Sequence, residues 1–147
     1  MQFPPEHYRD AAQDRLTDAA RLHAADRFVA SVYMSGVAVE CMLRAYRARE
    51  DDDFDGRHDL TKLMTASGIM SFIRETERRE FGAHLATVWS FWRNNLRFAE
   101  HSRFESHVRL IWPHRKGPAA AWASAEVFQS ATYVVTRGVF RWNSRRD

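Results

Sequence analysis

The feature that most constrains the fold is an apolar stretch from Arg27 to Tyr46 in a chain that is otherwise rich in charged residues. Apolar or small residues recur there at steps of three and four, which is the spacing of one face of an α-helix. These residues are Val29, Val32, Gly36, Val39, Leu43 and Tyr46. The residues between them are also mostly apolar or small, so the helix is expected to be covered on more than one side. We therefore predict that this stretch forms the central helix of a bundle.

Glu40 falls on the buried face of this predicted helix, together with Gly36. An unpaired carboxylate in such a position is energetically costly. We therefore predict that Glu40 is buried and paired, with His58, Arg93 and Arg97 as candidate partners. His58 has a second interpretation, because it stands just before a predicted helix and could cap it.

The segments on either side of the central helix also follow the helical period. A first helix opens at Pro4 and Pro5, and Asp26 is predicted to cap the central helix after a break. Asp59 and Gly68 are expected to start and stop a short helix. The remaining predicted helices are 75–98 and 119–142. No β-alternation longer than about four residues is present. The sequence predicts one all-α domain over residues 1–147, an up-down bundle of four to five helices.

Three segments are less regular. Residues 51–56 form an acidic run that lacks the ligand spacing of a calcium loop, so we interpret it as a solvated connector. Residues 69–73 are apolar and are predicted to be a turn of helix or a loop. Residues 100–118 contain three breakers, Pro113, Gly117 and Pro118, and are predicted to be irregular.

The net charge of +3 hides an asymmetry between the two halves of the chain. Residues 1–60 carry eight Arg against twelve Asp and Glu, a balance of −4, and residues 61–147 carry fourteen Lys and Arg against seven acids, a balance of +7. The second half is therefore the half expected to meet a polyanion. Twenty of the 22 basic residues are Arg, which suits phosphate contacts, although a GC-rich coding bias gives the same composition.

The composition also indicates where in the cell the protein is expected and whether it is expected to bind a metal or cofactor. The longest uncharged run, residues 28–39, is shorter than a membrane span requires, and no secretory pattern opens the chain. The single cysteine, Cys41, fits a reducing cytoplasm and is interpreted as a small buried hydrophobe. Seven His and one Cys show no close ligand pairing, so we expect no metal and no cofactor.

The order of four short pieces resembles the HEPN family, the small helical "higher eukaryotes and prokaryotes nucleotide-binding" domain. The pieces are residues 18–22 (DAARL), 35–45 (SGVAVECMLRA), 57–63 (RHDLTKL) and 92–98 (WRNNLRF). The resemblance extends over nearly the whole chain up to residue 98. It implies a helical bundle that usually forms a homodimer. It also implies one of two functions: a metal-independent ribonuclease of a toxin–antitoxin or defence system, or a non-catalytic module. The module would bind a nucleotide or a protein partner such as a nucleotidyltransferase or an antitoxin.

The ribonuclease motif of the resembled family is an Arg, often followed by Asn, then four to six residues and a His. Here Arg93 and Asn94 are followed by His101 after seven residues, and Arg97 is followed by His101 after three. Arg93, Asn94, Arg97 and His101 are the candidate catalytic residues, and the altered spacing leaves catalysis open. In such chemistry a His moves the proton of a 2′-hydroxyl and an Arg stabilises charge on the phosphate.

The segment after these residues supplies candidate phosphate contacts. They are Arg103, Arg109, Arg115 and Lys116. Trp112 and Trp142 lie in basic segments and are predicted either to stack on a base or to fill a dimer interface. A symmetric homodimer is expected, with the segments around Trp112 or the final helix contributing.

Overall fold

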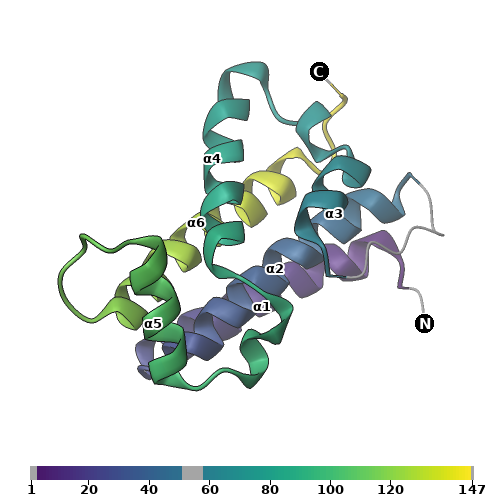
Figure 1. The fold of residues 1–147 in the computed structure, drawn as a ribbon. Coiled ribbons are helices and arrows are strands. Elements are labelled where there is room, and N and C mark those ends of the chain that lie inside the picture. Colours follow the sequence, from purple (N-terminus) through teal and green to yellow (C-terminus); the bar gives the residue numbers. More distant parts are fainter. Residues whose placement is uncertain (1–2, 51–57, 147) are drawn as a thin grey trace.

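The computed structural model describes residues 3–50 and 58–146, and within them the protein is all-α, with six α-helices, two 3₁₀-helices and no strand (Figure 1). The helices are α1 (Pro5–Ala24), α2 (Phe28–Ala48), α3 (Leu60–Ser67), η1 (Ile69–Ser71), α4 (Glu75–Phe91), η2 (Asn94–Phe98), α5 (His101–Ile111) and α6 (Ala119–Arg141). The all-α class predicted from the sequence is confirmed, and the helix count is higher than expected. The acidic run predicted as a connector lies outside the described residues.

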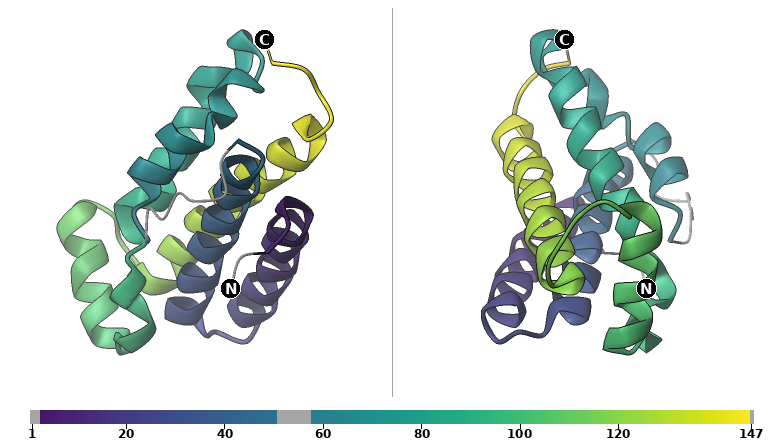
Figure 2. Two further views of the ribbon diagram at one scale, coloured as in Figure 1. Left: turned by 90° about the vertical axis from the view of Figure 1, so that its right-hand side faces the viewer. Right: turned by 60° about the vertical axis from the view of Figure 1, so that its left-hand side comes forward.

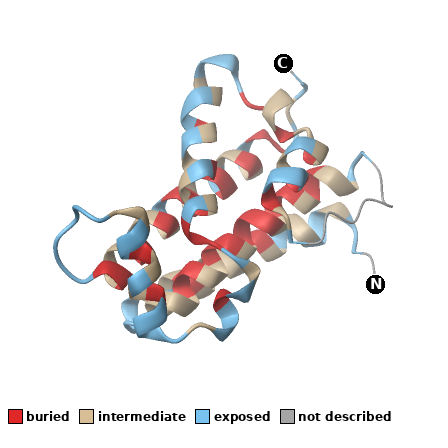
Figure 3. Ribbon diagram, in the orientation of Figure 1, coloured by how far each residue is buried: buried red, intermediate tan, exposed pale blue. Residues whose placement is uncertain are grey.

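Helix α2 is the centre of the molecule. It pairs with α1 in a hairpin and also contacts α3, α4, α5 and α6 (Figures 1 and 2). Buried positions extend along most of its length, whereas α4 and α5 present exposed outer faces (Figure 3). Helix α2 has 21 residues, and an 18-residue window within it has a mean hydropathy of 1.3, so the helix is long and apolar enough to cross a membrane. In this structure, however, 56% of that window is buried inside the protein. We interpret it as a core helix.

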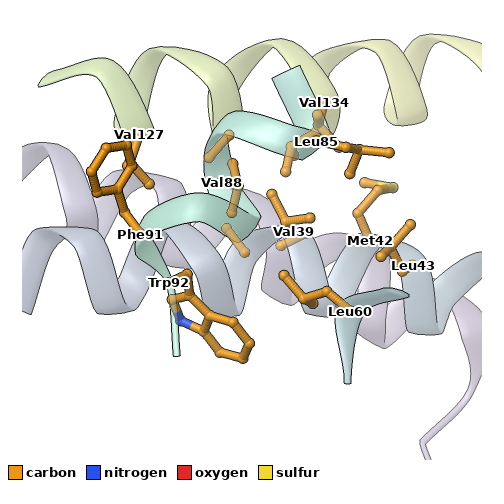
Figure 4. Packing of buried hydrophobic residues seen from close by; sticks show 14 of the residues in the cluster. Val39, Met42, Leu43, Leu60, Leu85, Val88, Phe91, Trp92, Val127 and Val134 are labelled. Atoms are coloured by element: carbon orange, nitrogen blue, oxygen red, sulfur yellow. The ribbon is translucent and has the colours of Figure 1, made fainter. Parts of the chain in front are cut away.

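The core lies where α2, α4 and α6 meet. Val39, Met42 and Leu43 of α2 face Leu85 and Val88 of α4, and valines of α6 close the other side (Figure 4). All five of these named side chains are fully buried. A polar contact adds direction to this packing, because the Tyr46 hydroxyl donates a 2.7 Å hydrogen bond to the Gly138 carbonyl of α6.

The turn between α1 and α2 differs from the prediction that Asp26 caps the central helix. Asp26 instead has a left-handed backbone with φ 57°, and Arg27 stands at the N-cap without a side-chain cap. The Arg27 N–H bonds the Leu22 carbonyl and the Asp26 N–H bonds the His23 carbonyl. These two bonds form the Schellman motif that ends a helix, with Asp26 in the position that glycine usually takes. Asp26 therefore ends α1, because aspartate tolerates the left-handed conformation.

The short helix α3 has both predicted ends. The Asp59 carboxylate accepts hydrogen bonds from the Thr61 and Lys62 backbone N–H groups, both at 3.0 Å. Gly68 closes the helix in the left-handed region with φ 62°. Residues 69–73 were predicted to be either a turn of helix or a loop. They contain η1, which is one turn of 3₁₀-helix.

The predicted long helix 75–98 is wrong in its last quarter. Helix α4 ends at Phe91, Trp92 and Arg93 are extended, and η2 follows. The reason is the Trp92 side chain, which lies on α2 at Gly36 and donates from Nε1 to the Tyr33 carbonyl at 3.1 Å. Leu96 is still buried, because η2 turns it back towards the core.

The predicted irregular segment 100–118 is wrong in its first part, which forms α5. The Glu100 carboxylate caps this helix by accepting the Arg103 N–H at 3.2 Å. Phe104 and Val108, four residues apart, supply its buried face.

A substitution at Gly36 tests the close approach of Trp92. A Cβ atom built at Gly36 would lie 1.8 Å from Trp92 Cδ1, so the indole must move. We expect Gly36→Ala to lower the free energy of unfolding by about 1–3 kcal/mol, measured by urea denaturation. Gly82→Ala in α4 is the matched control, since nothing lies within 4 Å of its added methyl group. It should raise the stability by up to about 1 kcal/mol. Equal stability of Gly36→Ala and the parent would contradict the contact.

Candidate nucleic-acid interface

The polar pair predicted from the sequence, Glu40 with His58, is present. Glu40 is 6% exposed, and His58 Nδ1 lies 3.0 Å and 3.1 Å from its two carboxylate oxygens. Arg44 is a further partner, and its Nε lies 2.8 Å from Glu40 Oε1. Arg93 and Arg97, the alternative partners, are engaged elsewhere. The link ties the middle of α2 to the start of α3, because His58 directly precedes the Asp59 cap.

Cys41 lies beside this link on α2. Burial raises the pKa of its thiol to about 11, and the neighbouring Glu40 carboxylate adds to the shift. The thiol is therefore protonated at neutral pH, as expected for a structural cysteine rather than a nucleophile.

The structure separates the four candidate catalytic residues into two pairs. Arg93 and Asn94 line a hollow of about 460 Å³ together with His58, Thr61 and Trp89. The Arg93 guanidinium donates to the Trp89 and Trp92 carbonyls at the end of α4, where a cation is favourable.

Arg97 and His101 form the second pair. They line a different hollow of about 500 Å³, beside Arg27 and Tyr33 at the start of α2. Both side chains are exposed, and His101 Nε2 is 3.8 Å from Glu105 Oε1. Glu100 also lines this hollow, and its pKa is lowered, first by its hydrogen bond from Ser102 and then by the backbone bond from Arg103.

A third hollow, of about 500 Å³, contains residues that the sequence reasoning did not connect. Arg93 and Arg103 line it together with Phe98 and His107. Burial lowers the pKa of His107, and the charge of Arg93 lowers it further. The sequence signal for this grouping was the four-residue spacing from Arg103 to His107, which places both on one face of α5.

Two of the other candidate phosphate contacts, Arg109 and Arg115, have structural partners. Arg109 donates to the Gly117 carbonyl at 3.2 Å, and Arg115 pairs with Glu126 at 3.2 Å while lying over the Trp122 ring. Lys116 is exposed in the connection between α5 and α6. Of the predicted set, Arg103 therefore lies nearest the candidate catalytic residues.

Several basic residues of the second half are neutralised by the fold. Glu77 of α4 accepts ion pairs from Arg137 at 3.3 Å and from Arg141 at 3.1 Å, which tie α4 to α6. Arg146 pairs with Glu50. Glu77 is already counted in the balance of +7, so of these pairs the one with Glu50, an acid of the first half, lowers the charge that this half offers to a ligand.

The two tryptophans predicted to stack on bases or fill a dimer interface have interior contacts. Trp142 is 7% exposed and packs edge-on against Tyr46 at 5.2 Å. Trp112 is half-buried and contacts Phe91 at 4.1 Å and Trp122 at 4.2 Å between ring centroids. Both rings thus help hold α6 in place.

Across residues 3–50 and 58–146, no three His, Cys, Asp or Glu side chains are grouped closely enough to hold a metal ion. Comparison of the chain with protein-family models, curated protein sequences and solved structures gave no match.

The buried link at Glu40 yields a stability prediction. Glu40→Gln keeps the shape but removes the charge that Arg44 and His58 face, so we expect about 1–3 kcal/mol lower stability. The lower part of that range reflects the half-exposed His58 side chain. Asp18→Asn is the control, because the side chains of its ion pair with Arg15 are 40% (Arg15) and 38% (Asp18) exposed and losing the pair should cost less than about 1 kcal/mol. Chemical denaturation of the two variants measures the difference, and equal midpoints would refute the role of the link.

Proposed function

We propose that this chain is an RNA-binding protein of the HEPN type, whose phosphate-contacting surface is formed by η2 and the first turns of α5. The observation that carries the proposal is a set of three arginines, Arg93, Arg97 and Arg103, on this short stretch. Within the described part of the chain, none of the three is paired with a carboxylate. Their charge therefore remains available to a phosphate backbone.

The segment around these three arginines carries more positive than negative charge. Residues 93–116 carry six Lys and Arg against two Glu, a balance of +4. Arg137 and Arg141 at the α4–α6 contact are matched by Glu77, and Arg146 by Glu50, whereas the arginines of η2 and early α5 have no carboxylate partner among the described residues. Unmatched cations on an exposed surface are what a polyanion requires.

An exposed aromatic residue lies among these arginines. Phe98 is 79% exposed, and the Arg97 guanidinium carbon lies 4.8 Å from its ring centroid. Aromatic rings beside cations are the usual stacking platforms for unpaired bases. This favours single-stranded RNA over a duplex as the ligand.

The contacts among the four resembling pieces support the HEPN type. Trp92 of the last piece lies on Gly36 of the second, and His58 of the third bonds Glu40 of the second. The Ser31 hydroxyl, just before the second piece, donates to the Ala19 carbonyl of the first at 2.9 Å. The pieces thus meet around α2, so their order in the sequence corresponds to a common set of contacts.

RNA binding should be steeply salt-dependent. We expect a labelled single-stranded RNA to bind at low salt, and Arg97→Ala and Arg103→Ala each to reduce the slope of log affinity against log salt by about 0.7. Arg79→Ala, an exposed arginine on α4, is the control for net charge. Fluorescence anisotropy measures all four proteins. If the Arg79 variant weakens binding as much as the other two, the surface is not the one proposed.

Metal-independent cleavage of the bound RNA is a second candidate function, favoured by the hollow that Arg97 and His101 share with Arg27. There the 2′-oxygen would attack the adjacent phosphorus while His101 takes its proton. The bond from phosphorus to the 5′-oxygen would break, and that oxygen would be protonated by water. The arginines would stabilise the charge on the phosphate oxygens.

The same RNA incubated in EDTA tests cleavage. The second candidate predicts fragments ending in a 2′,3′-cyclic phosphate, lost in His101→Ala and retained in His114→Ala, a control histidine exposed in the connection between α5 and α6. Salt-sensitive binding without cleavage would leave the non-catalytic module.

A symmetric homodimer is part of the proposal, since a two-fold axis would double the arginine surface. Leu110 on α5 and Phe140 on α6, 83% and 67% exposed, are the apolar side chains for such a contact. Sedimentation velocity at micromolar concentration should show twice 17.2 kDa, and a single species of 17.2 kDa would contradict it.

A further inference from the structure

We infer that the hollow beside the α5–α6 connection is a binding site for a guanidinium group, and that Arg115 of this chain is its resident occupant. The inference goes beyond the proposed RNA binding and does not depend on it. The hollow measures about 500 Å³, within the usual range for small-molecule sites of about 300–1,000 Å³.

Two tryptophan rings form walls of this site. The indoles of Trp112 and Trp122 lie at 85° to one another, with their ring centroids 4.2 Å apart. Both side chains line the hollow and are only partly buried, so a ligand in the hollow reaches them. The face of an indole attracts an organic cation more strongly than the faces of the other aromatic side chains do.

A carboxylate supplies the opposite charge. Glu126 lies one helical turn after Trp122 on α6, which places the two side chains on one face of the helix. It lines the same hollow, and its side chain is 40% exposed. An aromatic face beside a carboxylate suits a flat cation that stacks through its plane and donates N–H groups from its edge, and guanidinium has this geometry.

The guanidinium of Arg115 shows that such a group fits. Its central carbon lies 3.1 Å from the Trp122 ring centroid and 5.3 Å from that of Trp112. Its Nη2 donates to Glu126 Oε1 at 3.2 Å. A guanidinium from another molecule would make the same contacts in its place.

Arg115 is held in a way that permits exchange. Its side chain is 46% exposed, and residues 113–118, the connection that carries it, are all exposed (Figure 3). A cation over an aromatic ring and an ion pair each contribute little at an exposed position. An external guanidinium therefore competes with Arg115, which has the advantage of the high effective concentration of a tethered group.

An arginine derivative tests the site, and its citrulline counterpart is the uncharged control of nearly the same shape. The compounds are N-acetyl-L-arginine amide and N-acetyl-L-citrulline amide. Two-dimensional NMR of the whole ¹⁵N-labelled protein follows the tryptophan indole N–H signals, which Trp112→Phe and Trp122→Phe assign. We expect the arginine compound to shift the signals of these two indoles, and the citrulline compound to bind at least tenfold more weakly.

Removal of the resident group is the sharper test. Arg115→Ala vacates the site, so the affinity for the arginine compound should rise about tenfold. Lys116→Ala is the matched control, because it removes the neighbouring exposed positive charge and should bind as the parent does. In the Arg115→Ala background, Glu126→Gln and Trp122→Phe should each lower the affinity about two- to tenfold.

Equal binding of the arginine and citrulline compounds would overturn the inference, as would equal affinity of Arg115→Ala and Lys116→Ala for the arginine compound. No binding to Arg115→Ala would also overturn it and leave Arg115 as a structural latch. An arginine within a short glycine peptide distinguishes two sources of the group. Tighter binding of the peptide than of the amide would support a site for a protein side chain, and equal binding would support a site for a small guanidinium compound. Circular dichroism melting checks that each variant is folded.

Discussion

The contact of the Trp92 indole with α2 at Gly36 determines where most of the candidate surface lies. Only a residue without a side chain leaves room for the ring, and the Nε1 bond to the Tyr33 carbonyl fixes its direction. Because Trp92 turns towards α2, helix α4 ends at Phe91, the residue before it, and the backbone is extended at Trp92. Arg93, η2 and α5 follow from that change of direction, so a packing constraint in the core places the arginines.

Two uses of arginine can be distinguished among the described residues. Arg137 and Arg141 clamp Glu77, and Arg49 lies 4.6 Å from the Trp142 ring centroid while donating to the Trp142 carbonyl. These residues hold helices together through planar stacking and paired hydrogen bonds, for which guanidinium is suited. Those of η2 and early α5 have no such acidic partners in the described chain. High arginine content thus does not by itself indicate nucleic-acid binding, whereas the location of unmatched arginines does.

The sequence was informative where a single physical rule decides the structure. The apolar period of α2, the buried Glu40 and the Asp59 and Gly68 ends of α3 followed from helical spacing, the cost of a buried charge and the capping rules. It was misleading where two rules compete. Trp92 and Leu96 keep a helical interval although an extended Arg93 and the start of η2 lie between them. The neighbouring Asn94 and Asn95 are weak helix formers that favoured a break. Asp26 suits both a helix start and a left-handed helix end, and the tertiary turn selected the second. The grouping of Arg103 with His107 and Arg93 depends on how η2 folds back, which no local pattern encodes.

The elevated pKa of the Cys41 thiol makes this residue a built-in reporter of motion in the core. At about 11, it leaves on the order of one thiolate in a thousand at pH 8, so thiol reagents react slowly with the closed protein. Cys41 is partly exposed, and its reaction becomes faster when α2 separates from its neighbours and the thiol regains an ordinary pKa. A change in the labelling rate between variants therefore reports a change in how readily the central helix opens. Because Cys41 is the single cysteine in the chain, that signal arises from one place, next to the Glu40 link.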